Sequence, residues 1–408
     1  MNNLILYVSV FIFWYPLVMS IVWIIGGILF YYRREKKTVG PLNETPMVSI
    51  LIPCYNEEDT IENTVERLNN LNYPNYEIIT INDGSRDKTA LILDNLSRKY
   101  EKLRVIQLKT NAGKANALYL GLLASKGEFL MGLDADAYLD ADALNYMIPH
   151  FITPHYGERV GATTGNPRVL NRNSLLAKIQ LCEFSSIVSM IKRTQRLLGK
   201  VMTISGVVVM FRKRALIDCG LWDRDLVTED IGVTWKLQKR FWDIRYEPRA
   251  ICWMLVPETI VGLWKQRVRW AQGGLEVMLR HWDIFLDWRY RRLIPVYMEQ
   301  VLSIFWAIAW SILFIIIIIQ VIIGKQPFFP MFWEGQYLAL LCLVQFIVAM
   351  TLDKRYDENL LKYYLWAIWY PTFYWYLNIL VLLRAIPKVL FRDKGKKFAI
   401  WDSPDRGI

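Results

Sequence analysis

Long apolar segments near both ends of the chain constrain its fold more than any other feature. Residues 1–32 are almost wholly apolar and are followed by the basic stretch RREKK, and three more apolar segments lie at 298–323, 337–352 and 363–383. An α-helix rises about 1.5 Å per residue, so about 20 apolar residues cross the hydrocarbon core of a bilayer. The sequence therefore predicts a multi-pass membrane protein.

The first apolar segment lacks a basic start and an evident small-residue cleavage site, which favours a retained anchor over a signal peptide. Between the apolar segments, short apolar runs alternate with Gly, Asn and Asp, as in a soluble domain. We divide the chain into a transmembrane helix (1–34), a soluble domain (45–292), a transmembrane region of about three hydrophobic segments (298–385) and a basic tail (386–408).

The net charge of +11 indicates which side of the membrane the domain occupies. Much of the basic excess lies beside the apolar segments, at Arg33, Arg34, Lys36, Lys37, Arg289, Arg291 and Arg292. Basic flanks prefer the cytoplasmic side, so we expect a cytoplasmic domain of a membrane protein, with the lipid bilayer as a partner. No run of Lys and Arg interleaved with aromatic residues lies inside the domain, so we expect no nucleic-acid partner.

The cysteines and histidines exclude two further classes of site. The five cysteines are scattered without CxxC spacing, and the three histidines, His150, His155 and His281, do not form a cluster with them. Such a distribution is typical of a reducing compartment and of a protein that is neither a redox nor a zinc protein.

The first third of the domain alternates strand and helix patterns. MVSILIP, YEIITI, LRVIQL and EFLMGL predict strands, and amphipathic stretches between them predict helices. This alternation predicts an α/β, Rossmann-like fold with parallel strands and right-handed crossovers. In such sheets ligands bind beyond the carboxyl ends of the strands.

Polar groups follow each predicted strand, as a nucleotide site at that edge requires. The sequences after the four strands are PCYNEE, NDGSRD, TNAGKAN and DADA. Polar turns are common singly, and a lone D-x-D is a weak signal. Four together, ending in Asp134 and Asp136, indicate a nucleoside-diphosphate site with a divalent cation on the aspartates. Neither a G-x-G-x-x-G after the first strand nor a P-loop is present.

The ordered set PCYNE, NDGS, GKANA, LDADA, ISG, TED and QRVRW resembles the processive glycosyltransferases of family 2, which include cellulose, chitin and hyaluronan synthases. TGNPRV, CWMLVPET, GLWKQRVRWAQGG and WDSPDRG make the chain similar to poly-β-1,6-N-acetylglucosamine synthases of the intercellular-adhesin type. The resemblance covers nearly the whole chain and implies a GT-A glycosyltransferase domain inserted between transmembrane helices, with interfacial amphipathic helices.

The resemblance implies residues that bind the donor. Asp83 would accept a hydrogen bond from uracil, with Pro53, Tyr55 and Glu57 in the same base and ribose pocket. Lys114 would lie near the nucleotide, since a compact cation suits phosphate oxygens. Asp134 would touch the ribose or the donor sugar. Asp136 would ligate Mg²⁺ or Mn²⁺ between the two phosphates, where a Lewis acid assists group transfer.

The resemblance also assigns the catalytic group to the TED motif, Thr228, Glu229 and Asp230. A sugar hydroxyl is a weak nucleophile, so a carboxylate must accept its proton, and in the family that base is the aspartate, here Asp230. A single displacement inverts an α-linked donor into a β-linked product. Thr228 also suits a helix N-cap, and both interpretations are compatible.

The stretch GLWKQRVRWAQGG predicts a basic, Trp-bearing amphipathic helix at the membrane interface. The resemblance adds that Trp270 stacks on the acceptor sugar and that Gln266, Arg267 and Arg269 help to hold the diphosphate. Ser205 and Gly206 of ISG, with TGNP, would line the acceptor path. We assign no role to Cys182, Glu183 or the stretch IKRTQR.

Together these expectations describe a membrane-embedded, inverting, processive N-acetylglucosaminyltransferase. It would polymerise UDP-GlcNAc into β-1,6-linked poly-N-acetylglucosamine, a biofilm exopolysaccharide, and pass the growing polysaccharide outward. The linkage depends on the resemblance alone. Other β-glycan synthases of the hyaluronan or chitin type, a polyprenyl-phosphate glycosyltransferase and a catalytically inactive sensor of UDP-sugar are alternatives.

The expected topology contains a conflict. One span before the domain and three after it place the C-terminal end of the chain outside, yet this end holds basic residues, which prefer the inside, among them Arg384, Lys388, Arg392, Lys394, Lys396 and Lys397. We favour four crossings over a re-entrant hairpin around Pro371. The resemblance also implies a small membrane accessory subunit.

Overall fold

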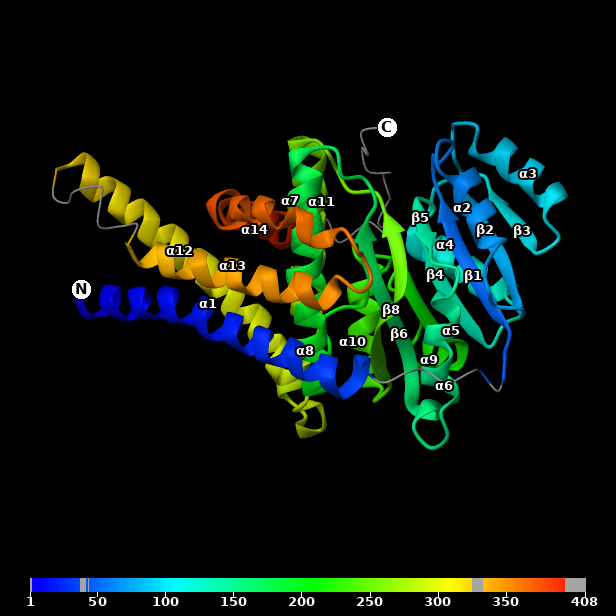
Figure 1. Ribbon diagram of the computed structural model, residues 1–408, viewed down its shortest axis with the longest axis horizontal. Helices are drawn as coiled ribbons and strands as arrows, with labels where there is room; N and C mark the ends of the chain where they lie inside the picture. The colour runs from blue at the N-terminus through cyan, green and yellow to red at the C-terminus, as the bar shows by residue number, and fades with distance from the viewer. Residues whose placement is uncertain (1, 37–41, 43, 325–332, 393–408) are drawn as a thin grey trace.

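The computed structural model describes residues 2–36, 42, 44–324 and 333–392. A large α/β domain lies at one end of the molecule, and the long helices α1 (Asn2–Phe30), α12 (Ile294–Ile322) and α13 (Trp333–Asp353) extend away from it side by side (Figure 1). The motif WDSPDRG and residues 393–397 of the basic tail lie outside the described residues.

The domain is built on an eight-stranded sheet with the order β3-β2-β1-β4-β7-β6-β8-β5. Its first half is parallel and alternates with helices, as the sequence predicts: β1 (Val48–Cys54), α2 (Ile61–Leu68), β2 (Tyr76–Asp83), α3 (Thr89–Lys99), β3 (Leu103–Leu108), α4 (Lys114–Ala124) and β4 (Phe129–Leu133). Every residue of β1, β2 and β4 is buried. Strands covered on both faces give the continuous apolar runs seen in the sequence, and the α/β fold is confirmed.

The second half of the sheet mixes directions. The further strands are β5 (Ala137–Leu139), β6 (Val160–Val169), β7 (Val208–Arg212) and β8 (Asp243–Met254). β7 runs antiparallel to both β4 and β6, and β6 pairs in parallel with β8. The helices of this half are α5 (Ala143–Met147), α6 (Pro149–Ile152), α7 (Leu175–Glu183), α8 (Ile191–Leu198), α9 (Lys213–Asp218), α10 (Glu229–Lys239) and α11 (Ile260–Arg280). The π-helix η3 (Phe184–Met190) joins α7 to α8.

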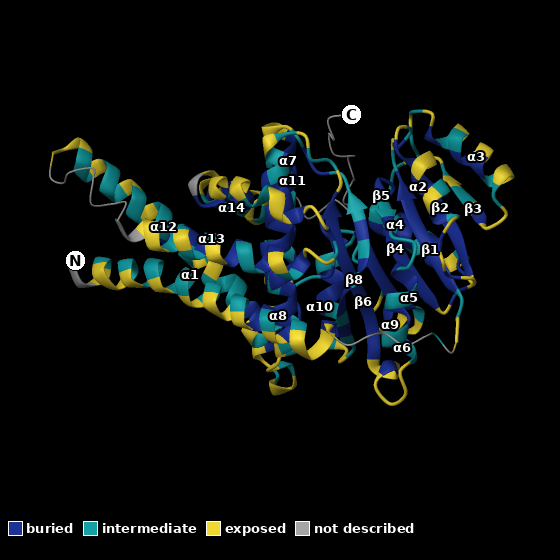
Figure 2. Cartoon of the chain, viewed as in Figure 1, coloured by how far each residue is buried: buried dark blue, intermediate teal, exposed yellow. Residues whose placement is uncertain are grey.

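Two apolar clusters fill the faces of the sheet. Ile50 and Ile52 of β1 pack on one side, whereas Leu51 packs with Ile79 and Ile81 on the other. Alternate residues of a strand point to opposite faces, so one strand supplies both clusters. Figure 2 shows the sheet as the most deeply buried part of the molecule, and the outward faces of α1 and α12 as intermediate or exposed although they are apolar. Such faces suit a lipid environment.

Three helices of the described residues are long and apolar enough to cross a membrane: Leu4–Glu35, Ile294–Ile322 and Gly335–Asp353. The fourth crossing that we expected at 363–383 is not among them. This stretch is divided between the 3₁₀-helix η7 (Leu360–Ile368), the π-helix η8 (Tyr370–Tyr374) and α14 (Trp375–Leu390). α14 packs along α11, with Leu377 and Val381 in a cluster shared with Leu263.

Crossings at these three candidate helices alone would remove the conflict in the expected topology. One would precede the domain and two would follow it, so the residues after α13 would return to the side of the domain. Arg384, Lys388 and Arg392 would then lie on the side that basic residues prefer. Hydropathy alone could not distinguish a spanning helix from an apolar segment that packs on α11.

A buried ion cluster joins the ends of the membrane helices to the domain. Arg193 of α8 lies 2.5 Å from Glu35, which follows α1, and 2.8 Å from Asp353, which ends α13. Arg168 of β6 lies 2.6 Å from the other oxygen of Asp353. These side chains are almost fully buried. Charges withdrawn from water must be paired, so the cluster fixes how the helices meet the domain.

We predict that Arg193→Met destabilises the protein by about 3–5 kcal/mol, because it leaves the buried carboxylate of Glu35 without its cation and removes one of the two arginines that pair with Asp353. The measurement is the thermal unfolding of the detergent-solubilised protein. Arg196→Met is the matched control, since Arg196 lies one turn further along α8 and pairs with the partly exposed Asp243. Equal losses of stability for the two variants would contradict this interpretation.

Candidate active site

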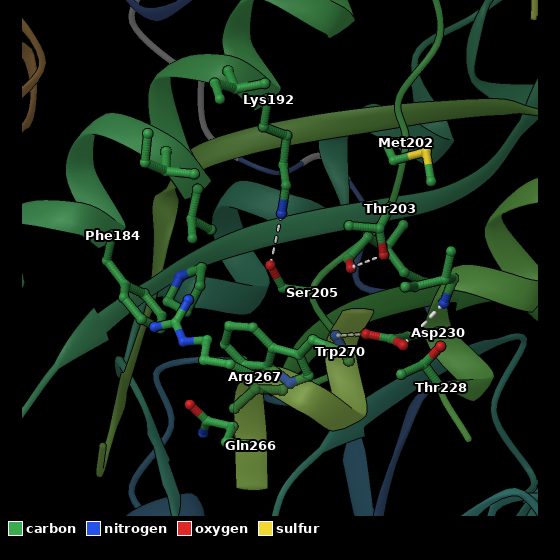
Figure 3. A pocket seen from close by; sticks show the side chains of 18 of the residues that line it. Phe184, Lys192, Met202, Thr203, Ser205, Thr228, Asp230, Gln266, Arg267 and Trp270 are labelled. Atoms are coloured by element: carbon green, nitrogen blue, oxygen red, sulfur yellow. Dashed lines mark hydrogen bonds between the residues drawn. The ribbon is translucent and has the colours of Figure 1, made fainter. Parts of the chain in front are cut away.

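A cavity of about 550 Å³ lies between the edge of the sheet and the membrane helices. Twelve of the sequence-predicted site residues line it: Lys114, Asp134, Asp136, Ser205, Gly206, Thr228, Glu229, Asp230, Gln266, Arg267, Arg269 and Trp270. Figure 3 shows Asp230, Trp270, Gln266 and Ser205 around one space. Segments more than 130 residues apart in the sequence therefore meet at one place.

One end of the cavity is formed where β4 stops. Asp134 and Asp136 follow β4, and Asp136 is 7% exposed. Lys114 begins α4, directly after Gly113, whose φ of 89° suits glycine. The Lys114 amine lies 2.6 Å from Asp134 Oδ1 and 3.0 Å from Glu229 Oε1. Burial opposes the charge of Lys114, but the carboxylates of Asp134 and Glu229 outweigh it and raise the pKa of Lys114.

Asp230 lies in the first turn of α10 and faces the centre of the cavity. The backbone N–H of Gly206 donates to its Oδ2 at 3.2 Å, and the N–H of Ile231 donates to its Oδ1 at 2.9 Å. Burial and the neighbouring Glu229 raise the pKa of Asp230 to about 6, against the opposing charge of Lys114. A carboxylate with such a pKa is able to act as a general base near neutral pH.

Thr228 occupies the N-cap position of α10, but its side chain makes no capping hydrogen bond. Its hydroxyl oxygen is buried, and no partner for it lies among the residues that the structure describes. The capping role that its sequence position suggested is therefore wrong for the side chain. Thr228 instead lies against Gly273 of α11, where a Cβ would lie 1.9 Å from the threonine hydroxyl.

α11 brings the QRVRW motif to the cavity. Both terminal nitrogens of Arg267 bind the buried carboxylate of Glu183, at 2.9 and 2.7 Å. The guanidinium also lies 4.5 Å from the ring centre of Trp270 and 5.9 Å from that of Tyr374. We expected Arg267 to hold the diphosphate. In the structure its guanidinium instead makes a bidentate ion pair with Glu183 and stacks on the ring of Trp270.

Four residues that we expected to bind the donor nucleotide are not part of the lining of the cavity: Pro53, Tyr55, Glu57 and Asp83. They stand at the carboxyl ends of β1 and β2; β1 is next to β4 in the sheet, and β2 is next to β1. Asp83 is fully buried and accepts hydrogen bonds from the N–H groups of Ala112 and Gly113, at 3.0 and 2.8 Å. It therefore holds the turn that presents Lys114, and its pKa is raised by burial.

Several cavity residues were missed from the sequence. Glu183, Lys192 and Gln195 come from stretches to which we gave no role, and Glu299 lies inside an apolar segment. The sequence around Glu183, Lys192 and Gln195 contains no motif that would have identified them. Glu299 did carry a signal, because an acid within a predicted membrane helix is usually functional.

The aspartates after β4 are the residues that fit a divalent cation. Among the described residues there is no group of three or more His, Cys, Asp or Glu side chains that could hold a metal. Mg²⁺ is commonly bound by one or two carboxylates together with substrate phosphates. The buried Asp136, with Asp134 beside it on the cavity wall, suits this mode and does not suit an all-protein metal cage.

Comparison of folds identifies a related architecture. The structure of the mannosyltransferase PcManGT from Pyrobaculum calidifontis in complex with GDP-Man and Mn²⁺ superposes with a TM-score of 0.59. It covers 94% of this chain and 100% of that chain, with 17% sequence identity. At this identity the likeness shows a shared GT-A-like fold with apolar helices.

Sequence comparison is more specific. Poly-β-1,6-N-acetyl-D-glucosamine synthase of a Staphylococcus epidermidis strain is 43% identical over 412 residues, covering 97% of this chain and 98% of the relative. The synthase of Staphylococcus aureus strain MSSA476 is 44% identical over 420 residues, with the same coverage. The family signature of Glycosyl transferase family 2 matches residues 49–220. The chain therefore belongs to glycosyl transferase family 2 and, within it, to the poly-β-1,6-N-acetyl-D-glucosamine synthases.

Proposed function

We propose that the protein polymerises N-acetylglucosamine from UDP-GlcNAc into a β-1,6-linked polysaccharide, with its domain in the cytoplasm of a bacterial cell. The observation that carries the chemistry is the joining of the D-x-D aspartates to the TED motif through Lys114. A diphosphate site and a proton acceptor then share one cavity. The sugar and the linkage follow from the names of relatives that are 43–44% identical over nearly the whole chain.

The donor would lie across the end of β4. Asp136, with Asp134, would hold Mg²⁺ or Mn²⁺, and Mn²⁺ is the ion in the structure of the mannosyltransferase. When bound, the cation neutralises charge on the departing diphosphate. Arg269 and Gln266 line the same cavity and would bind diphosphate oxygens, whereas Pro53, Tyr55, Glu57 and Asp83 would form the adjoining nucleoside site.

The acceptor would lie between Asp230 and Trp270. Its hydroxyl oxygen attacks the anomeric carbon of the donor sugar, and its proton passes to the carboxylate of Asp230. The bond from the anomeric carbon to the diphosphate oxygen breaks, and UDP leaves. Because attack and departure occur on opposite faces, the α-linked donor becomes a β-linked product. Ser205 and Gly206 would border the acceptor, and the stack of Arg267 on Trp270 would hold the aromatic platform still.

The cavity also reaches residues of α1 and α12, which offers the product a route toward the membrane. Synthesis and outward passage would then share one polypeptide. A small membrane accessory subunit remains a prediction from the resemblance to the family.

We predict that membranes containing the protein convert labelled UDP-GlcNAc and Mg²⁺ into a polymer that a β-1,6-specific glycosidase degrades. Asp230→Asn should lower incorporation by about 10²–10⁴-fold, because the acceptor then lacks a base. Nucleotide binding and membrane insertion of the variant serve as controls. A polymer made from another UDP-sugar, or a product that partitions into organic solvent, would contradict the proposal.

We predict an acid limb in the pH profile. Asp230 acts only when unprotonated, so with a pKa near 6 the value of kcat/KM should be level above this pH and fall about tenfold per unit below it. Radiolabel incorporation from pH 5 to 8 measures the limb. Incorporation that stays level down to pH 5, as expected if the group titrates near pH 4 like an ordinary aspartate, would show that Asp230 is not the base or is not perturbed.

We predict that Gly273→Ala strongly lowers activity, since the added methyl group would displace Thr228 and with it the TED turn. Gly274→Ala is the matched control, because a Cβ at this neighbouring residue of α11 has no atom within 4 Å. Both changes raise helix propensity by about 1 kcal/mol, so an effect of propensity alone would appear equally in the two. Incorporation assays on the purified variants separate these outcomes.

A further inference from the structure

Six basic side chains gather where α8 ends, on the side of the domain from which two membrane helices leave. Arg34 belongs to the end of the first candidate span, and Arg292 lies two residues before α12. The other four belong to the domain: Arg159, Arg196, Lys200 and Arg245. We call these six residues the basic patch, and none of them lines the cavity described above.

The contact between α1 and α8 places part of the patch at the end of a membrane helix. Glu35, the residue after Arg34, is ion-paired to α8, and Arg196 lies one turn further along the same helix. Figure 1 shows the end of α1 beside α8. Burial lowers the pKa of Arg196 against the opposing charge of Asp243, and the charges of Arg245 and Arg34 lower it further. Arg34 and Arg196 are therefore electrostatic neighbours.

The charges of the patch are not balanced. Arg196 lies 2.9 Å from Oδ1 of Asp243, and Arg245 lies 2.8 Å from Oδ2. In the described part of the chain, no other acid lies within ion-pair distance of the patch. Four basic side chains are therefore left without an ionic partner among the described residues: Arg34, Arg159, Lys200 and Arg292.

Lys200 lies at the centre of this excess of positive charge. It is half-buried and directly follows Gly199, the left-handed residue that ends α8. Burial lowers the pKa of Lys200 to about 8, against the opposing charge of Asp243. Like charges also act to lower this pKa, and they come from three arginines: Arg159, Arg196 and Arg292. One ammonium thus lies among guanidinium groups from distant parts of the sequence.

A bound anion would remove the repulsion within the patch. Like charges brought together at a half-buried place cost free energy, so a cluster that serves stability alone is expected to pair its cations. The buried ion cluster around Arg193 and Asp353 does so. Guanidinium and ammonium groups bind phosphate oxygens through charge-assisted hydrogen bonds. The basic patch therefore suits a phosphate group.

The surroundings of Arg292 favour a lipid as the source of that phosphate. Leu286 and Trp288 precede Arg292 by a few residues and are 71% and 76% exposed, although they are apolar. An exposed Trp beside basic residues is typical of a segment at the membrane–water interface, where anionic headgroups attract Lys and Arg. The outward faces of α1 and α12 are apolar, so acyl chains have a surface to follow.

We propose that the basic patch binds the phosphate headgroup of an anionic phospholipid, with Lys200 and Arg292 as its principal contacts. The bound headgroup neutralises part of the positive charge that Asp243 leaves unpaired. It also joins the ends of α1 and α8 to the start of α12, so it stabilises the attachment of the membrane helices to the domain. The site lies outside the cavity and does not depend on which sugar the protein transfers.

The test uses the full-length protein purified in a neutral detergent. The probes are phosphatidylglycerol, phosphatidylcholine as the neutral lipid, and inorganic phosphate as the anion without acyl chains. Native mass spectrometry measures the Kd of each probe, and thermal unfolding measures the stabilisation that each probe gives. UDP binding reports that each variant is folded.

The double variant Lys200→Gln/Arg292→Gln removes the principal contacts of the patch. Its matched control is Arg98→Gln/Lys126→Gln, which removes the same charge from exposed residues of the parallel half of the domain. Neither Arg98 nor Lys126 forms an ion pair among the described residues. Lys200→Arg, which keeps a cation at the centre of the patch, is the rescue variant.

We expect the wild type to bind phosphatidylglycerol about tenfold or more tightly than phosphatidylcholine, and to unfold at a higher temperature with the anionic lipid. The patch variant should lose about tenfold or more of this affinity, as loss of charge-assisted hydrogen bonds predicts. Its UDP binding should be unchanged. The control variant and Lys200→Arg should bind phosphatidylglycerol like the wild type.

Equal affinity of the wild type for the two lipids would overturn the proposal, and this comparison needs no variant to fold. Equal losses in the patch and control variants would show a general effect of net charge and would also overturn it. Inorganic phosphate that binds as tightly as phosphatidylglycerol would identify a site for soluble anions in place of a lipid. None of these measurements requires polymer synthesis, so they leave the proposed function untouched.

Discussion

The ammonium of Lys114 is the contact on which the arrangement of the site depends. Its amine lies between carboxylates of Asp134 and Glu229, which are 95 residues apart in the sequence. Without this cation, the acids of the D-x-D and TED motifs would repel one another across one low-dielectric cavity. The N-terminus of α4, the end of β4 and the first turn of α10 must therefore meet at one point. Asp83 supports the contact from behind, since it binds the backbone of the turn that precedes Lys114.

α8 connects this site to the membrane helices. Its consecutive residues 192–195 are all buried, and each contacts a different part of the molecule. Lys192 reaches the loop that also binds Asp230, Arg193 enters the ion cluster, and Thr194 donates to the backbone of α1. Gly26 of α1 allows this approach, because a Cβ there would lie 2.4 Å from the side chain of Thr194. A shift of α1 against α8 would therefore displace residues that line the cavity, because packed interiors transmit displacements.

The site residues that could be predicted from the sequence are those that directly follow a predicted strand. Parallel strands bring their carboxyl ends to one edge, so Asp134, Asp136 and Lys114 could be placed on the same edge of the sheet from the alternation of strands and helices. The pairing of Glu183 with Arg267 could not, because it joins residues 84 apart on two helices whose packing no motif specifies. Whether residues 363–383 cross the membrane could not be judged from the sequence for a related reason. Their apolar character is real, but it serves contacts with α11 and α13, and only the tertiary structure distinguishes these neighbours from lipid.

The polarity of the cavity changes along its length in the way that its proposed reaction demands. The end at β4 holds acids and a cation that suit a charged diphosphate, the middle holds Asp230 and the face of Trp270, and the far end presents Glu299 within α12. A sugar polymer leaving the reacting centre exchanges its contacts with water for contacts with protein groups, and unpaired hydroxyls would be costly at the depth of an apolar helix. Hydrogen-bonding side chains on α1, α8 and α12 lower that cost where the chain would pass. The same lining is too polar for lipid, which explains why these side chains face inward while the apolar faces of α1 and α12 remain outside.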